Sequence, residues 1–102
     1  MDKQIFEEIQ ALKRQILPNE KVILFGSQAR GDARPDSDWD LLVLLNKKKR
    51  NFHEDFDKYA YPFSEIGDKY GTCIIPIVHT VNDWAKPSML RYNVEREGIE
   101  IV

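Results

Sequence analysis

Apolar residues at the start of the chain recur with the spacing of a helix face. They follow one another at intervals of four, three and four residues, at Ile5, Ile9, Leu12 and Ile16. Asp2 stands where a helix is commonly capped, and Pro18 stands where one commonly ends. The pattern predicts an amphipathic helix over residues 3–17 that packs its apolar side against the rest of the domain.

Two apolar runs follow, and both are typical of strands buried in a sheet. Residues 21–25 end at a glycine, and residues 38–45 include five consecutive apolar positions. A continuous apolar run indicates a central strand covered on both faces. The polar segment 28–37 connects the two strands, and its first residues can form a short helix.

The next part of the chain adds a helix and a third strand. Apolar spacing predicts a helix over residues 53–69, with Pro62 as a kink or restart point. β-Branched residues predict a strand over 72–79, in which Pro76 favours a place at the sheet edge or at a bulge.

The C-terminal residues complete the domain. Trp84 is expected in a loop, residues 88–97 predict a final helix closed by Gly98, and residues 99–102 predict a last short strand. The chain is therefore expected to form a single α/β domain over residues 1–102, in which helices flank a small mixed sheet.

The composition sets limits on partners and location. The 102 residues carry 15 Lys plus Arg against 17 Asp plus Glu, a net charge of -2, which gives no global case for binding nucleic acid or an anionic membrane. Cys73 is the only cysteine, so a disulfide framework is excluded and the reducing cytoplasm is expected. The longest apolar run, 41–45, is too short to span a membrane, and the N-terminus lacks a secretory signal.

One run of positive charge stands out at residues 47–50, Lys-Lys-Lys-Arg. It is either a solvated loop at the end of the second strand or a contact for a nucleic acid or a triphosphate. The acidic segment 54–57, directly after it, weighs against the second interpretation.

The candidate chemistry lies between the first two strands. Gly26 at a strand end lets backbone amides approach an anion, Ser27 adds a hydroxyl donor, and a helix beginning there would direct its positive end to the same place. Asp38 and Asp40 are two residues apart at the start of a strand, so their carboxylates project from one face and can share divalent cations. A phosphate site beside two hard oxygen ligands indicates Mg²⁺.

Other phosphate and metal motifs do not fit this stretch. A calcium loop starting at Asp36 would need Gly where Leu41 stands and Glu where Lys47 stands. The chain also lacks the Gly-Lys-Ser/Thr of a P-loop and the Gly-x-Gly-x-x-Gly of a dinucleotide-binding turn.

The stretch resembles the signature of the minimal nucleotidyltransferases, small members of the DNA polymerase β-like superfamily. The resemblance is carried by Gly26-Ser27, ten intervening residues and the pair Asp38-x-Asp40 leading into an apolar strand. Residues 93–99 continue it more weakly. It implies a polymerase β-like nucleotidyltransferase fold.

The resemblance also implies roles for these residues. Gly26 and Ser27 would hold the β and γ phosphates of ATP or another nucleoside triphosphate, and Asp38 and Asp40 would be the catalytic, Mg²⁺-binding carboxylates. Arg30 is a candidate triphosphate contact, or it pairs with a carboxylate and is structural.

One feature departs from the superfamily pattern. The resemblance implies a third carboxylate on a later strand, yet residues 72–79 contain no Asp or Glu. A neutral imidazole at His79 is a poor replacement for a hard anionic ligand, and Cys73 is expected to serve packing. Nucleotide and metal binding are expected, and catalysis by this chain alone is expected to be slow.

Two functions remain open. The first is transfer of a nucleoside monophosphate, AMP from ATP, to a hydroxyl on a partner protein. The second is a nucleotidyltransferase-fold binding module that neutralises a toxin by complex formation. The resemblance implies a HEPN-domain toxin as the partner in either case, in a homo- or hetero-oligomer, and Trp39 and Trp84 are candidate interface anchors.

Overall fold

The computed structural model describes residues 1–102, and its centre is a sheet of four strands in the order β3-β2-β1-β4. The strands are β1 (Lys21–Phe25), β2 (Trp39–Leu45), β3 (Ile74–Thr80) and β4 (Ile99–Glu100). Strand β1 runs antiparallel to β2 and β4, whereas β2 and β3 are parallel. The predicted mixed sheet is therefore confirmed.

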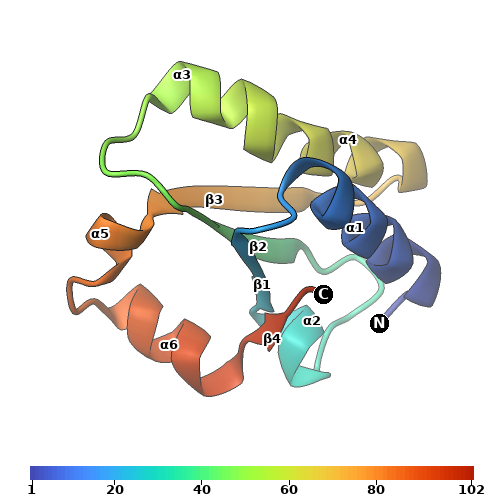
Figure 1. The fold of residues 1–102 in the computed structure, drawn as a ribbon. Coiled ribbons are helices and arrows are strands. Elements are labelled where there is room, and N and C mark those ends of the chain that lie inside the picture. The colour runs from blue at the N-terminus through green and yellow to red at the C-terminus, as the bar shows by residue number, and fades with distance from the viewer.

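Helices lie on both faces of this sheet (Figure 1). The longer ones are α1 (Lys3–Ile16), α4 (Tyr61–Tyr70) and α6 (Met89–Glu97), and the four-residue ones are α2 (Ser27–Arg30), α3 (Phe52–Asp55) and α5 (Val81–Trp84). Helices α1 and α4 cover one face, and α5 and α6 lie on the other. The architecture is α/β, as the sequence predicts.

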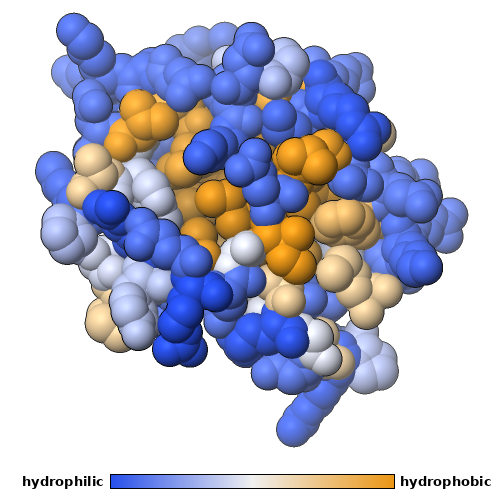
Figure 2. Space-filling view, turned by 60° about the horizontal axis from the view of Figure 1, so that its bottom comes forward, coloured by the Kyte–Doolittle hydropathy of each residue, from blue (hydrophilic) through white to orange (hydrophobic).

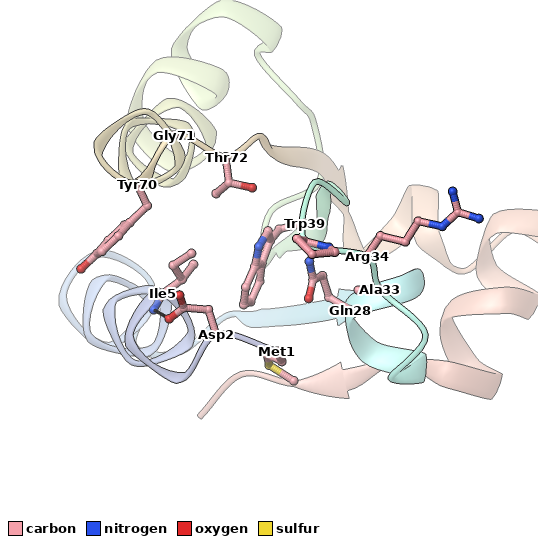
Figure 3. Close-up of a pocket in the computed structure, with 11 residues that line it drawn as sticks. Met1, Asp2, Ile5, Gln28, Ala33, Arg34, Trp39, Tyr70, Gly71 and Thr72 are labelled. Atoms are coloured by element: carbon pink, nitrogen blue, oxygen red, sulfur yellow. Dashed lines mark hydrogen bonds between the residues drawn. The ribbon is translucent and has the colours of Figure 1, made fainter.

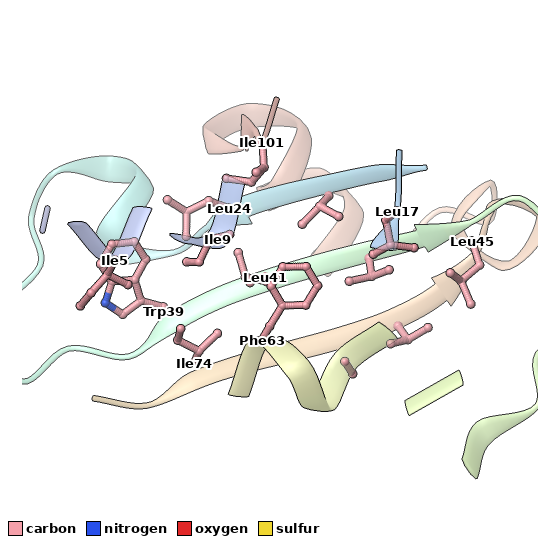
Figure 4. Packing of buried hydrophobic residues seen from close by; sticks show 14 residues of the cluster. Ile5, Ile9, Leu17, Leu24, Trp39, Leu41, Leu45, Phe63, Ile74 and Ile101 are labelled. Carbon is pink, nitrogen blue, oxygen red and sulfur yellow. The ribbon is translucent and has the colours of Figure 1, made fainter. Parts of the chain in front are cut away.

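Strand β2 is apolar from Leu41 to Leu45 because both of its faces are buried there. Leu41 and Val43 belong to the larger core, which lies between the sheet and the helices α1 and α4 (Figure 4). Leu42 and Leu44 point the other way, into a smaller cluster that includes Val94 of α6. The predicted central strand, covered on both sides, is confirmed.

The first helix begins where its capping residue predicts. The carboxylate of Asp2 accepts hydrogen bonds from the backbone N–H groups of Gln4 at 2.9 Å and Ile5 at 3.2 Å, which satisfies donors that have no partner within the helix. The helix ends at Ile16, one residue before the predicted boundary.

The helix predicted over 53–69 is divided into three parts. Between α3 and α4 lies a π-helical turn, η1 (Phe56–Ala60). Pro62 sits in the first turn of α4, directly after the π-helical turn, and its missing N–H interrupts the helical hydrogen bonding at that point. The prediction of a kink or restart at Pro62 is confirmed.

Helix α4 approaches β3 closely because Gly67 has no side chain. A Cβ at Gly67 would lie 2.8 Å from the carbonyl oxygen of Thr72 and 3.0 Å from the backbone nitrogen of Ile74. Any larger residue would push the helix away from the beginning of β3.

Strand β3 is an edge strand, as Pro76 predicts. Its only neighbour in the sheet is β2, with Pro76 opposite Leu41.

The positive run at residues 47–50 is held at both ends. The Arg50 guanidinium donates a hydrogen bond to the carbonyl oxygen of Val78 at 2.7 Å, and Lys47 pairs with the buried Asp55 at 2.5 Å. The ends of the positive run thus bind the domain itself, while Lys48 and Lys49 are exposed as expected of a solvated loop.

Three expectations for the second half of the chain are wrong. Trp84 lies in helix α5 rather than a loop, because the Thr80 hydroxyl caps that helix by accepting from the N–H of Asp83 at 3.1 Å. Strand β4 contains two residues instead of four. Cys73 is exposed and so does not serve the core.

The two tryptophans serve packing. Trp39 is 2% exposed and lies within the larger core, so the expectation that it anchors an interface is wrong. Trp84 is half-buried against the smaller cluster, with its ring 5.7 Å from that of His79. No helix of the chain has the length and apolar character needed to cross a bilayer.

A polar contact joins α1 to α4. The Tyr70 hydroxyl donates to the carboxylate of Glu8, and the Lys69 ammonium lies 3.1 Å from the same carboxylate. The hydrogen bond to Glu8 raises the pKa of Tyr70 to about 12. A raised pKa means that this contact stabilises the fold fully below about pH 10, the tyrosine value in an unfolded chain, and loses its effect as the pH rises through the folded value.

We therefore expect a tyrosine ionisation near pH 12 when absorbance at the tyrosinate band is followed against pH. The step should disappear in Tyr70→Phe and move toward lower pH in Glu8→Gln. Tyr92→Phe, which removes an exposed hydroxyl on α6, is the control and should leave the step in place. A step unaffected by Tyr70→Phe would contradict the Tyr70–Glu8 contact.

Candidate functional site

The five residues singled out from the sequence line one pocket. This pocket, of about 410 Å³, lies where β1 ends and β2 begins, and it is closed on one side by α6. Its polar lining includes the predicted set, which is Gly26, Ser27, Arg30, Asp38 and Asp40. Glu97 and Asn93 of α6 join them from the far end of the chain.

Gly26 forms the sharp turn between β1 and α2. Its φ of 77° falls where residues other than glycine are strained, and its carbonyl oxygen accepts from the N–H groups of Ala29 and Arg30 at 3.1 and 3.0 Å. A Cβ at this position would collide with Oδ2 of Asp40. Glycine is therefore required twice, for the turn and for the close approach of the carboxylate.

Helix α2 contributes less than the sequence suggests. It has only four residues, so its dipole is small and adds little positive potential at the turn.

Asp38 and Asp40 face the same pocket because Trp39 between them points into the core. Asp38 is exposed just before β2, and Asp40 is half-buried opposite Phe25 of β1. Partial burial raises the pKa of Asp40, and the nearby charge of Asp38 raises it further, while Arg30 opposes the shift. Two hard carboxylates that disfavour each other's charge fit a divalent cation, which would relieve the repulsion.

No third protein ligand completes a metal cluster. The chain contains no group of three or more His, Cys, Asp or Glu side chains arranged around a common point. Ile75 lies opposite Asp40 in the parallel pair of β2 and β3, and it is 39% exposed. This is where a carboxylate from the later strand would stand beside Asp40.

His79 does not fill that position. It lies four residues beyond Ile75, opposite Leu44, and burial lowers the pKa of its imidazole. It is a residue of the strand end beside Trp84, as the sequence suggests, and no part of the pocket.

Arg30 is bound by carboxylates. Its guanidinium contacts both oxygens of Glu97, at 3.2 and 3.1 Å, and Asp32 at 3.2 Å. These bonds raise its pKa. Of the two roles left open for Arg30, pairing with carboxylates is the one formed in this structure.

Sequence reasoning missed Glu97. Its Oε1 accepts from the backbone N–H of Gly26 at 3.1 Å in addition to its pair with Arg30. One signal was present, because an acidic residue in the last turn of a helix is unfavourable against the helix dipole. Such a local conflict commonly marks a functional position.

A second pocket, of about 430 Å³, lies near β2 but holds neither aspartate of the pair. It opens between the beginning of α1, the loop before β2 and the end of α4, and the buried Trp39 is among the residues that line it (Figure 3). Its lining has no cluster of carboxylates, so it lacks the chemistry of the first pocket.

Comparison with known proteins agrees with the geometry. The pattern of the family described as nucleotidyltransferase domain matches residues 3–97. The chain belongs to this nucleotidyltransferase family. The match spans the turn, the carboxylate pair and α6, and it places the chain in the nucleotidyltransferase class of enzymes.

One curated relative is a Methanocaldococcus jannaschii protein, MJ0141, named provisionally as a protein adenylyltransferase. It is 35% identical over 82 residues, which cover 80% of this chain and 78% of that protein.

Solved structures share the fold. A toxin–antitoxin with AMP-PNP superposes with a TM-score of 0.64 and 18% identity, over 95% of this chain and 72% of that one. The toxin–antitoxin MntA-HepT gives a TM-score of 0.58 and 16% identity, over 99% of this chain and 72% of that one. The polymerase β-like nucleotidyltransferase fold implied by the sequence is confirmed.

Gly26→Ala should destabilise the fold by roughly 2–4 kcal/mol, because backbone strain and a collision with Asp40 add together. Gly31→Ala is the matched control. Gly31 also has a positive φ, 85°, but nothing lies within 4 Å of a Cβ there, so it should cost only about 1–2 kcal/mol. Equal losses in urea unfolding would show that the approach of Asp40 does not constrain Gly26.

Asp40→Asn should stabilise the metal-free protein at neutral pH. The substitution removes a charge that burial and Asp38 both disfavour. Because solvent screens part of this repulsion, the gain is expected to be a few tenths of a kcal/mol. Thermal unfolding in EDTA measures it, with the exposed Asp36→Asn as control. A lower melting temperature for Asp40→Asn would contradict the repulsion.

Proposed function

We propose that this chain transfers a nucleoside monophosphate, AMP from ATP, to a hydroxyl on a partner protein with the help of Mg²⁺. The observation that carries the proposal is the contact between the Gly26 turn and the Asp40 carboxylate. This contact brings phosphate donors and metal ligands into one pocket open to solvent.

The residues of the pocket have two roles, phosphate binding and metal binding. The N–H groups of the turn and the Ser27 hydroxyl would bind the β and γ phosphates, and Asp38 and Asp40 would hold Mg²⁺. When bound, the ion would neutralise the negative charge that builds on the leaving pyrophosphate.

In the transfer, the acceptor oxygen forms a bond to the α-phosphorus as the bond to the β-phosphate oxygen breaks. Pyrophosphate leaves with the electron pair of that bond. The hydroxyl proton passes to solvent, because an isoleucine stands beside Asp40 where a carboxylate would accept it. Isolated catalysis is therefore slow.

The partner is a toxin in this proposal, and the chain is its antitoxin. Support comes from the names of similar proteins: MJ0141 is provisionally a protein adenylyltransferase, and the solved structures are toxin–antitoxin proteins. The resemblance to minimal nucleotidyltransferases points to a HEPN-domain toxin.

A second function is favoured by Ile75. Without a third carboxylate, the same fold can neutralise a toxin by complex formation alone.

Co-expression of a HEPN toxin with the wild-type chain and with Asp38→Ala/Asp40→Ala separates AMP transfer from binding alone. Growth rescue together with an AMP-sized mass increase on the toxin, both lost in the variant, supports transfer. Rescue that persists in the variant supports binding alone.

Binding of the nucleotide should depend on the ion. Calorimetry with MgATP should give binding that EDTA weakens by at least about tenfold, because the carboxylate pair repels a triphosphate that carries no Mg²⁺. Asp38→Asn/Asp40→Asn should lose this dependence on the ion. ATP binding indifferent to both EDTA and the variant would contradict the site.

Ile75→Asp should raise AMP transfer by about tenfold or more, since it places a carboxylate beside Asp40 in the register of β2 and β3. The position is exposed enough for a charge to remain hydrated. Val81→Asp, at an equally exposed position beyond the end of β3, is the control. Transfer of labelled AMP to the partner is the readout, and no gain in a folded Ile75→Asp would show that the position lacks the catalytic importance assigned to it.

A further inference from the structure

Glu97 occupies donors that a phosphate group would use. Its carboxylate accepts from the Gly26 N–H at 3.1 Å and from the Arg30 guanidinium at 3.1 and 3.2 Å. A backbone N–H at a tight turn and a guanidinium are the usual pair of donors to a phosphate oxygen. The Glu97 side chain is 14% exposed and that of Arg30 is 44% exposed, so Glu97 is largely shielded from water while the guanidinium stays open to solvent.

We infer that Glu97 is an internal competitor of the nucleotide, whose carboxylate must leave the Gly26 N–H and Arg30 before the triphosphate can take them. This inference rests on the proposed function of the pocket. It gives Arg30 two states, paired with Glu97 in the empty site and paired with phosphate in the loaded one.

The charges of the pocket support competition over simultaneous binding. Asp38, Asp40 and Glu97 surround a single positive residue, Arg30. A triphosphate brought beside an unmoved Glu97 would meet three carboxylates with Arg30 as the one protein cation in the pocket lining. A carboxylate and a phosphate cannot both accept one N–H with good geometry.

Glu97 is not placed as the third metal ligand. It forms no three-residue ligand group with Asp38 and Asp40, and its oxygens are directed to nitrogen donors. Its position at the end of α6 is also unfavourable for a negative charge. The bonds to Gly26 and Arg30 offset that disadvantage, and they are the ones that a nucleotide would remove.

The competition links the pocket to the C-terminal helix. Leu90, Asn93 and Glu97 are the residues of α6 that line the pocket, and Glu97 is the one that bonds to its opposite wall. The next residue, Gly98, still bonds to the Val94 carbonyl at 2.7 Å, and Ile99 pairs with Leu24. Displacement therefore concerns the Glu97 side chain and the wall formed by α6, while β4 keeps the helix end attached to the sheet.

The test is the affinity of Glu97→Gln for MgATP and for inorganic tripolyphosphate with Mg²⁺, measured by calorimetry. Glutamine keeps the size and an acceptor for Gly26 but loses the charge that holds Arg30. We expect both probes to bind about 5- to 10-fold more tightly, since neutral hydrogen bonds are about half as strong as charge-assisted ones. Glu95→Gln is the matched control, because Glu95 lies on the same helix and pairs with Arg91 away from the pocket, and its affinities should equal those of the wild type.

A second variant separates charge from contact. Glu97→Asp retains the charge but is too short to reach Gly26 and Arg30 together, so it should also bind the probes more tightly than the wild type. Thermal unfolding without nucleotide confirms that each variant is folded.

The outcomes distinguish failure of the Glu97 competition from failure of the proposed function. Unchanged or weaker binding by a folded Glu97→Gln, with a wild type that binds MgATP through Asp38 and Asp40, overturns the competitor and leaves the proposed function standing. A wild type that binds neither probe, together with variants that bind neither, overturns both. Tighter binding by both Glu97 variants but not by Glu95→Gln supports the competitor.

Discussion

The site depends on the register between β1 and β2. This pairing sets Phe25 opposite Asp40, so the turn that follows Phe25 meets the Asp40 carboxylate. A slip of one residue would turn Asp40 toward the core and bring the Trp39 ring into the pocket. Burial of Trp39 in the larger core therefore holds the carboxylates in place. The alternation of Asp38, Trp39 and Asp40 between pocket and core fixes both the packing of the domain and the chemistry of its surface.

The parts of the fold predicted from the sequence are those decided locally. Three such features act within a few residues of the chain: the alternation of β2, the cap at Asp2 and the proline at the start of α4. The spacing from Gly26 to Asp40 likewise predicted the site. The contact of Glu97 with Gly26 could not be found in this way, because the two residues are 71 positions apart in the chain. The π-helical turn and helix α5 were missed because their boundaries depend on packing and on the Thr80 cap, which periodicity does not register.

The pocket is assembled at some expense of stability. Asp40 is half-buried beside Asp38, and Glu97 ends a helix at its negative pole. The domain tolerates these conflicts because the sheet between the two clusters is well packed, with Val22, Leu24, Leu41 and Val43 fully buried. Local frustration confined to one edge of an otherwise consistent fold is typical of a functional site.

The outer edge of β3 has a consequence for the behaviour of the free chain. Figure 2 shows apolar side chains gathered on the face of the molecule that comes forward when the bottom of Figure 1 is turned toward the viewer. Along β3 itself, Pro76 has no N–H to offer and the Val78 carbonyl is already occupied by Arg50. Another chain that paired with this edge would therefore lack one N–H donor and one free carbonyl acceptor. The gap disfavours extension of the sheet into a fibril from this side.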